Sequence, residues 1–158
     1  MNIFRHISPN KQTMKSRPIS VIVIHATATP SLASPLAWLC DPKSRVSAHY
    51  LIDVTGDIYQ LVDDMDIAWH AGTSMWNGIH GVNSISIGIE LVNANDGKMP
   101  YSQAQVAAVT ELVKSLSYQH GVKPEDVVAH YDVAPGRKND PVGFDFETLR
   151  SELMPPGC

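Results

Sequence analysis

The sequence lacks the features that define several common classes of protein. It has only two cysteines, Cys40 and Cys158, among 158 residues, too few for the disulfide framework of a small secreted domain. Neither lies in a CxxC or other zinc-binding spacing, and both a Cys40–Cys158 bridge and two free thiols fit this count. No apolar run reaches the about eighteen residues of a transmembrane helix, and no signal peptide precedes Pro18.

These absences predict a location. We expect no membrane insertion and a cytoplasmic location for the chain as written. Delivery by lysis, by a secretion system or by a signal that was removed would instead place it in the periplasm or outside the cell.

Charge is also scarce, since only 18% of the residues are charged and the net charge is −4. Such a surface gives no electrostatic reason to bind nucleic acid or an anionic membrane. Hydrophobic residues make up 44% of the chain, and a chain of this length buries about two-thirds of its unfolded surface as one domain. We expect a monomer with an irregular polar arm at residues 1–18 and a single domain at residues 19–158.

Short apolar runs alternate with helical patterns along the chain, which is typical of an α/β protein. The expected strands are residues 19–24, 49–54, 58–62, 84–92 and 127–129, and residues 66–83 form a long loop. The expected helices begin at Ser34, at Ser102 and near Asp145. The second of these ends near His120, with a capping box from Ser102 and Gln105 and a buried stripe of Val106, Val109, Val113 and Leu116. The pattern predicts one central mixed β-sheet flanked by helices.

Two histidines and an aspartate follow elements whose ends can meet. His25 follows the strand at residues 19–24, His130 follows the strand at residues 127–129, and Asp140 follows an Ala-Pro-Gly turn. Strand ends are where α/β proteins place their chemistry. A single histidine here is more often structural, but two imidazoles and a carboxylate leave zinc a free position to bind and activate a water. The sequence therefore predicts one Zn²⁺ per chain, at the strand ends in an open cleft.

Two further charged residues lie near this predicted site. Glu90 shares the polar side of its strand with Ser86 and Gly88, and a carboxylate there can act as a general base on a water. Lys138 lies two residues before Asp140 and can stabilise an oxyanion on a hydrolysed carbonyl. The alternatives are a surface glutamate at a strand end and an exposed lysine.

The remaining histidines and two tryptophans are candidates for other roles. His49 is expected to be structural, His80 to be exposed, and His120 to lie in the last turn of the long helix. His70 and Trp69 in the long loop are predicted to form a wall of the cleft that binds substrate. Trp69 and Trp76 can each also be core packing for that loop.

Five motifs in order resemble the type-2 N-acetylmuramoyl-L-alanine amidases, whose fold is shared with phage amidase-lysozymes and peptidoglycan recognition proteins. The resemblance runs from Ile19 to Leu149. The motifs are Val23-Ile24-His25, Arg45-Val46-Ser47-Ala48-His49, Ala68-Trp69-His70-Ala71-Gly72, Ser86-Ile87-Gly88-Ile89-Glu90, and His130 through Pro141. The resemblance implies zinc ligands His25, His130 and Asp140, a catalytic Glu90 and a stabilising Lys138. It implies cleavage of the amide between N-acetylmuramic acid, or its 1,6-anhydro form, and the L-alanine of the stem peptide of peptidoglycan or a muropeptide.

The resemblance also bears on the branch of the family. The phage and animal branches carry a tyrosine at the position of Ala48 and often a cysteine at that of Asp140, so this chain resembles the bacterial glutamate-type branch. Arg45 matches an arginine that binds substrate carboxylate in the recycling enzymes, but Val82 stands where a second such arginine is expected. A non-catalytic peptidoglycan-binding module, a zinc hydrolase of an unrelated amide, and a phage lysis enzyme or delivered toxin are the alternatives.

Overall fold

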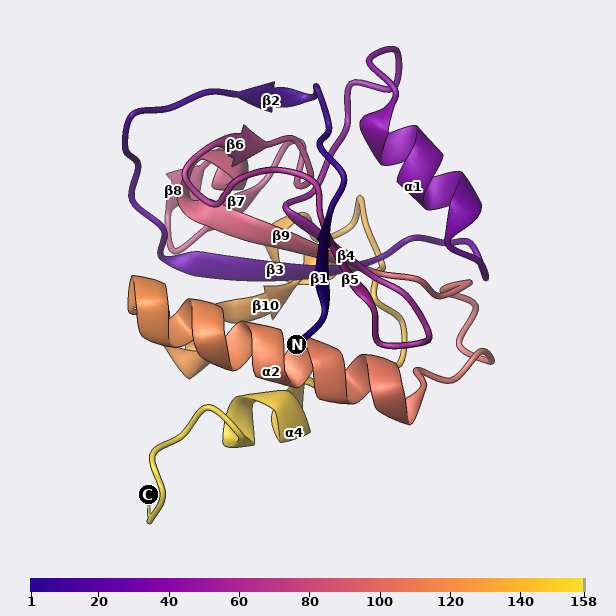
Figure 1. Ribbon diagram of the computed structural model, residues 1–158. Helices are drawn as coiled ribbons and strands as arrows, with labels where there is room; N and C mark the ends of the chain where they lie inside the picture. Colours follow the sequence, from indigo (N-terminus) through magenta and orange to yellow (C-terminus); the bar gives the residue numbers. More distant parts are fainter. Residues whose placement is uncertain (158) are drawn as a thin grey trace.

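A mixed six-stranded sheet organises the structure, a computed structural model that describes residues 1–157 (Figure 1). The sheet has the strand order β1, β5, β4, β9, β3, β10. The strands are β1 (Ile3–Arg5), β3 (Val21–Ala26), β4 (Tyr50–Ile52), β5 (Ile58–Gln60), β9 (Ser86–Leu91) and β10 (Val127–Ala129). Only the expected hairpin of β4 and β5 is antiparallel within this sheet, and the other neighbouring strands are parallel.

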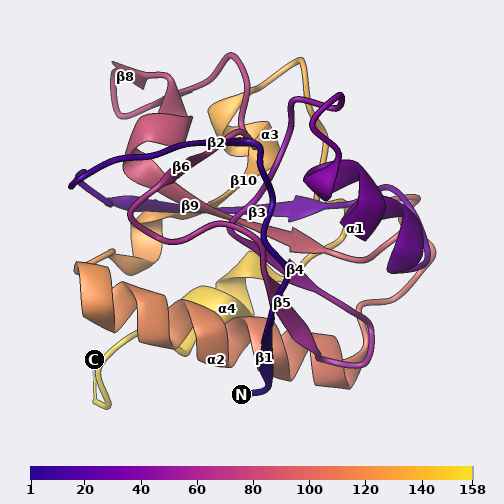
Figure 2. The same ribbon diagram turned by 45° about the horizontal axis from the view of Figure 1, so that its top comes forward.

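Helices cover both faces of this sheet (Figures 1 and 2). The helices are α1 (Ala33–Cys40), α2 (Gln103–His120), α3 (His130–Val133) and α4 (Phe146–Ser151), with 3-10 turns η1 (Val82–Ile85) and η2 (Pro124–Asp126). The small strands are β2 (Lys11–Gln12) paired with β6 (Ile67–Ala68), and β7 (Met75–Trp76) paired with β8 (Ile79–His80). Helices α2 and α4 pack on one face, whereas α1, α3 and the β6–β8 segment lie over the other. The predicted fold class is confirmed.

Alternation along β3 and β9 gives the two faces different chemistry. Ile22 and Ile24 of β3 pack in the apolar layer under α2 and α4, as do Ile87 and Ile89 of β9. Side chains alternate across a strand. His25, which follows Ile24, and Glu90, which follows Ile89, therefore face the other side. His25 and Glu90 are paired in register, so their side chains lie next to each other.

The long helix α2 confirms the expected bounds but not all the expected contacts. The Ser102 hydroxyl accepts a hydrogen bond from the Gln105 amide, and Gly121 ends the helix with a φ of 71°. The capping box is wrong, because the Gln105 side chain is buried and donates to the carbonyls of Ile52 and Val92, both at 3.0 Å. Val106 is also 38% exposed rather than buried.

The prediction of an irregular N-terminal arm is wrong. Residues 3–5 pair in parallel with β5, and residues 11–12 pair with β6. The free backbone edge of β5 supplies hydrogen-bond partners that the local sequence does not reveal. Helix α1 begins at Ala33 rather than after a Ser34 cap, and the loop at residues 66–83 contains three short strands and η1.

The sequence left a Cys40–Cys158 bridge open and predicted no membrane insertion. Residue 158 lies outside the described residues, and so does the alternative of a Cys40–Cys158 bridge. Within residues 1–157, no helix combines the length and apolar character that crossing a bilayer requires.

Candidate metal centre and its cavity

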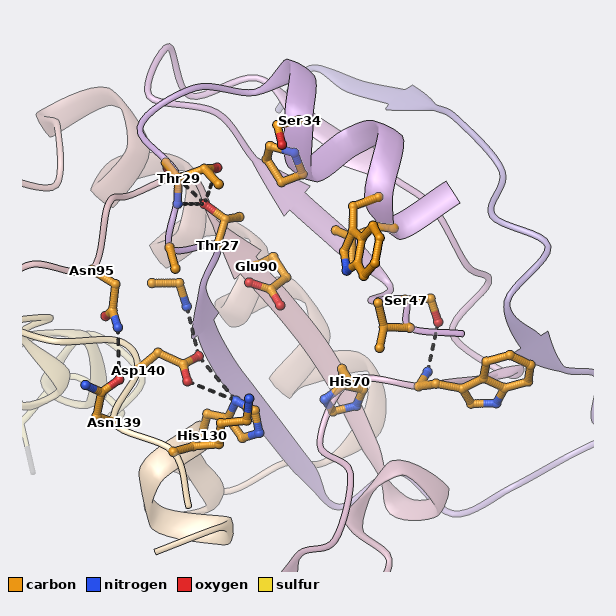
Figure 3. A pocket seen from close by; sticks show the side chains of 18 of the residues that line it. Thr27, Thr29, Ser34, Ser47, His70, Glu90, Asn95, His130, Asn139 and Asp140 are labelled. Carbon is orange, nitrogen blue, oxygen red and sulfur yellow. Dashed lines mark hydrogen bonds and ion pairs between the residues drawn. The ribbon is translucent and has the colours of Figure 1, made fainter. Parts of the chain in front are cut away.

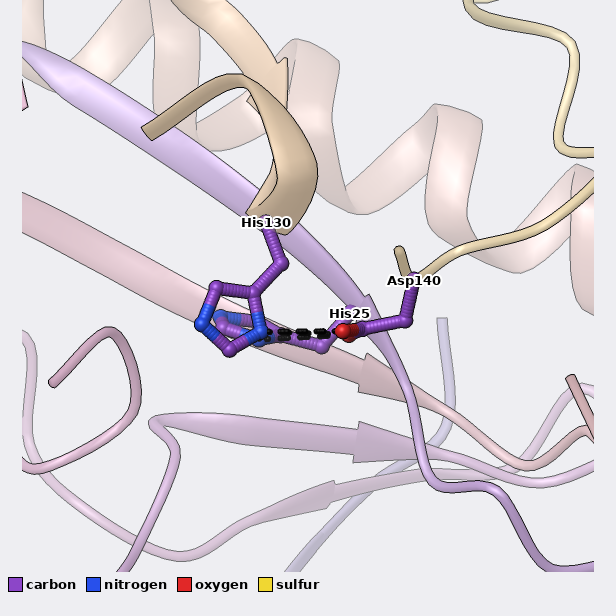
Figure 4. A group of neighbouring side chains, drawn as sticks. All are labelled: His25, His130 and Asp140. Carbon is purple, nitrogen blue, oxygen red and sulfur yellow. Dashed lines mark hydrogen bonds and ion pairs between the residues drawn. The ribbon is translucent and has the colours of Figure 1, made fainter. Parts of the chain in front are cut away.

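Three side chains that are far apart in sequence meet at one point (Figure 4). His25 is the penultimate residue of β3, and His130 directly follows β10, whose Ala129 pairs with Ile24, so the two imidazoles come from adjacent strand ends. The Nδ1 atoms of His25 and His130 are 2.9 Å apart. Oδ2 of Asp140 lies 3.3 Å from Nδ1 of His130 and 3.7 Å from Nδ1 of His25. The structure brings the three predicted ligands together.

These donors fit a divalent metal ion. The His130 Nε2–H faces the Ala71 carbonyl at 3.2 Å, and a carbonyl can only accept, so Nδ1 of His130 is the nitrogen left to bind a metal. Burial, followed by the nearby His130, lowers the pKa of His25 well below its ordinary value, which favours the neutral form of this ring. All three separations are within the about 4.2 Å that one ion with Zn–N bonds of about 2.1 Å can span.

Glu90 lies beside this metal-binding group. Its Oε1 is 4.0 Å from Nδ1 of His25, and its Oε2 is buried without a hydrogen-bond partner among residues 1–157. Burial, and then the charge of Asp140, raise the pKa of Glu90 to about 8, while Lys138 lowers it. A carboxylate with an unpaired oxygen is costly in a folded protein unless a ligand or reactant uses it.

The group opens into a cavity of about 810 Å³ that Glu90, His130, Asp140 and Lys138 all line (Figure 3). Lys138 is exposed and follows the turn at residues 134–137, in which its amide donates to the Ala134 carbonyl. A cavity of this volume accommodates a ligand larger than a single amino acid. The predicted open cleft at the strand ends is therefore present.

The predicted substrate-binding residues have different positions. Trp69 lines the cavity, with its backbone amide held by the Ser47 hydroxyl at 2.8 Å. His70 also borders the cavity, but it is only 8% exposed, and both of its ring nitrogens face protein groups. Arg45 is exposed, and the cavity wall beside it is formed by its neighbours Val46 and Ser47.

Sequence reasoning missed several lining residues. Trp38 of α1 is 57% exposed and lines the cavity. Asn95 and Asn139 form part of the opposite wall and are joined by a 3.0 Å hydrogen bond (Figure 3). The short helix expected from Ser34 gave no reason to place Trp38 on the solvent side, and the two asparagines lie in irregular segments.

The other histidines lie outside the metal-binding group. His49 is buried, and its Nδ1 accepts a hydrogen bond from the Gly88 amide at 3.0 Å. His80 is exposed, as expected. His120 ends α2 and lies 3.3 Å from the Asp64 carboxylate. Trp76 donates to Asp126 at 2.9 Å and packs against the core, so for this tryptophan the packing alternative holds.

Known proteins resemble the chain over most of its length. It is 40% identical over 150 residues to the N-acetylmuramoyl-L-alanine amidase AmiD of Escherichia coli K12, covering 85% of this chain and 53% of AmiD. It is 40% identical over 113 residues to the 1,6-anhydro-N-acetylmuramyl-L-alanine amidase AmpD of Haemophilus influenzae, covering 70% of this chain and 60% of that protein. The chain thus spans between about half and three-fifths of the length of these relatives.

A solved structure gives the same result for the fold. E. coli AmiD in complex with the substrate anhydro-N-acetylmuramic acid-L-Ala-D-γ-Glu-L-Lys superposes with a TM-score of 0.79 at 39% identity, over 89% of this chain and 60% of that chain. The sequence also matches the family described as N-acetylmuramoyl-L-alanine amidase, Amidase_2, over residues 15–143. With the fold, the convergent donors and this match together, the chain belongs to the N-acetylmuramoyl-L-alanine amidase family.

Proposed function

We propose that this protein is a zinc-dependent amidase that hydrolyses the bond between N-acetylmuramic acid, or its 1,6-anhydro form, and the L-alanine of the stem peptide. The observation that carries the proposal is the convergence of His25, His130 and Asp140 next to Glu90 in one open cavity. Two neutral imidazoles and a carboxylate are a zinc ligand set that leaves a position free. Family membership supplies the amide that the site would cleave.

Zinc held by His25, His130 and Asp140 would lower the pKa of a water and polarise the lactyl carbonyl. The chain's own residues then carry the remaining steps. Glu90 removes a proton from the attacking water, because its carboxylate lines the same cavity, with Oε1 4.0 Å from Nδ1 of His25. Both Lys138 and a nearby cation favour the ionised form of Glu90 that this step requires.

Lys138 supplies charge to the oxyanion that forms on the attacked carbonyl. Its ammonium lines the same cavity as Glu90 and Asp140, and fixed positive charge at a developing oxyanion stabilises the transition state. Glu90 then returns its proton to the L-alanine nitrogen. The C–N bond breaks, which releases the stem peptide and the muramyl carboxylate.

The walls of the cavity suggest how substrate is held. We propose that Trp69 and Trp38 offer apolar surface to the sugar or the peptide, since both line the cavity and Trp38 is largely exposed. Arg45 is exposed near this wall and remains a candidate for contact with a substrate carboxylate. Val82 is fully buried in η1, so a second carboxylate contact does not come from that position.

A non-catalytic peptidoglycan-binding module is the alternative from another class. Binding alone does not require the buried Glu90 carboxylate, whose Oε1 lies 4.0 Å from Nδ1 of His25 and whose Oε2 has no hydrogen-bond partner among residues 1–157. This observation favours the enzyme.

Replacement of Glu90 by glutamine tests the proposal. We expect E90Q to retain one zinc per chain by metal analysis, and to release stem peptide from muropeptides about 10²–10⁴ times more slowly than the wild type. Near-normal turnover of E90Q would exclude the role of Glu90. Zinc binding without any release of peptide by the wild type would favour the binding module.

The choice of substrate distinguishes the biological roles. Intact sacculi and soluble anhydro-muropeptides should be compared, with plain peptides as the test for an unrelated amide hydrolase. Preference for the soluble anhydro form favours a recycling enzyme, and preference for sacculi favours a lysis enzyme or a delivered toxin.

A further inference from the structure

We propose that His70 and Ser86 are positioning residues that hold His25 in the tautomer able to bind a metal. The inference rests on the proposed zinc site but not on the identity of the substrate. His70 was expected to bind substrate from the cleft wall. In the structure its two ring nitrogens link His25 to Ser86.

The direction of this hydrogen-bond chain is set at its far end. The Ser86 hydroxyl donates to the Val82 carbonyl at 2.7 Å. A hydroxyl has a single proton, so towards His70 the Ser86 oxygen can only accept. The His70 Nε2 lies 3.0 Å from that oxygen and must therefore carry the proton of the ring.

The same reasoning continues to His25. With its proton on Nε2, neutral His70 presents a lone pair on Nδ1, which lies 2.9 Å from Nε2 of His25. The Nε2 of His25 is then the donor, and its Nδ1 is left as a lone pair facing His130 and Asp140. Metal-binding histidines commonly have their second nitrogen fixed by a partner in this way.

The opposite direction of this hydrogen-bond chain would prevent Nδ1 of His25 from binding a metal. If Ser86 donated to His70 and His70 donated to His25, the remaining proton of His25 would lie on Nδ1, pointing at His130. A metal could then bind only after that proton had been displaced. The short bond from Ser86 to the Val82 carbonyl favours the direction that leaves Nδ1 free.

The fold makes room for His70 and holds it in place. A Cβ atom at Gly88 of β9 would lie 2.4 Å from the nearest atom of the His70 ring, so only glycine at this position admits the ring. The side-chain oxygen of Asn83 accepts hydrogen bonds from the amides of His70, at 3.1 Å, and Ala71, at 2.8 Å. A ring that is largely buried, hydrogen-bonded through both nitrogens and anchored through its backbone is suited to orient its neighbour.

The next residue orients the second histidine ligand. The Ala71 carbonyl faces Nε2 of His130 at 3.2 Å and also accepts from Arg137 at 2.6 Å. Arg137 donates in addition to the Thr73 carbonyl at 2.9 Å, which ties this segment to the loop that carries Asp140. Residues 70 and 71 thus direct the lone pairs of both imidazoles to the same point.

Zinc affinity of three variants tests the inference. His70→Leu removes the acceptor, and we expect its zinc dissociation constant to rise about 10–100-fold in competition with a chromophoric chelator. His70→Asn can keep an acceptor near the position of Nδ1 and should recover most of that affinity. His49→Asn removes a neighbouring buried imidazole that does not contact His25, and it should bind zinc as the wild type does. Equal affinities of the two His70 variants would overturn the inference.

A second measurement needs no variant and no substrate. Long-range ¹H–¹⁵N spectra of the zinc-loaded wild type should show both His25 and His70 protonated on Nε2. A proton on Nδ1 of His70 would overturn the inference even if the His70 variants fail to fold. If the expected tautomers and zinc affinities are found but no muropeptide is cleaved, the proposed function fails and this inference stands.

Discussion

The two faces of the central sheet are built from alternate residues of the same strands, yet they differ in what they bury. Under α2 and α4, β3 and β9 contribute only apolar side chains such as Ile22, Ile24 and Ile89. On the opposite face the same strands contribute His25, Ser86 and Glu90, which are largely removed from solvent. Each of these strands therefore contributes to the apolar core on one side and to the candidate site on the other.

The difference teaches that the polar face depends on specific partners. Apolar burial is roughly proportional to area and tolerates rearrangement, whereas a buried polar group is costly unless it is hydrogen-bonded or binds a ligand. Most polar groups here have such partners, but Glu90 has an oxygen without one. The α2 face should therefore govern folding stability, and the polar face should respond to metal and protons.

Adjacent residues on β9 offer the strongest test of this contrast. Ile89 is fully buried on the apolar face, so Ile89→Ala should lower the free energy of unfolding by about 2–5 kcal/mol. The zinc-free Glu90→Gln protein should lose no stability, because it replaces a carboxylate whose ionisation is opposed by burial. Urea unfolding of both proteins measures this, and a larger loss for Glu90→Gln would reverse the assignment of the faces.

Zinc should stabilise the polar face by mass action. At a free zinc concentration 100 times the dissociation constant, the free energy of unfolding should increase by about 2.7 kcal/mol. Asp140→Asn removes a charged donor from the group and should lose most of this gain. Thermal unfolding with zinc and with a chelator measures the effect. An equal gain in stability for the wild type and for Asp140→Asn would mean that the ion binds at another site.

Protons should act on the polar face through His49. Burial, with a smaller contribution from Arg17, lowers the pKa of His49 from 6.5 to about 4 against the opposing effects of Asp66 and Asp64. Between these values the folded state binds fewer protons than the unfolded chain, so stability falls as the pH drops from 6.5 to 4, by up to about 1.4 kcal/mol per pH unit.

His49→Asn isolates this contribution, since it can keep an acceptor for the Gly88 amide while removing the titrating group. Urea unfolding of zinc-free wild type and variant between pH 4 and 6.5 should show a shallower slope for His49→Asn. Identical slopes would mean that His49 does not titrate as expected.

The smallest expected effect compares exposed aromatic residues on the two sides of the molecule. Trp38→Ala on α1 should raise KM, because about 0.5–1.5 kcal/mol of aromatic contact with the substrate is lost, and should leave kcat little changed. Tyr118 on α2 is 94% exposed, and Tyr118→Ala is the matched control that should alter neither constant. Steady-state kinetics with a soluble muropeptide measures both, and an unchanged KM for Trp38→Ala would remove Trp38 from the binding site.

Much of the fold and the metal-binding group could be predicted because both depend on local pattern. The alternation at residues 84–92 and the β-branched run at residues 19–24 identified the central strands. A histidine directly after each of two buried strands then implied a shared site, which β3 and β10 provide. Asp140 was identified because a Pro/Gly-containing turn precedes it.

Other features could not be predicted, because they arise from contacts between distant segments. The pairing of Ile3–Arg5 depends on the free edge of β5, which a short local sequence cannot indicate. The contacts of His70 depend on Ser86, His25 and the space above Gly88. The exposure of Val106 was missed because helix α2 packs through Leu112 and Gln105 instead.

The parallel register of β10, β3 and β9 has a consequence for building the same site on another protein. Neighbouring strands lie about 4.8 Å apart, so the pairing of β10, β3 and β9 sets the spacing of Glu90, His25 and His130, which directly follows β10. Only Asp140 must be supplied by a loop. Another parallel sheet with three adjacent strand ends should therefore accept the same arrangement, if one connecting segment can deliver a carboxylate.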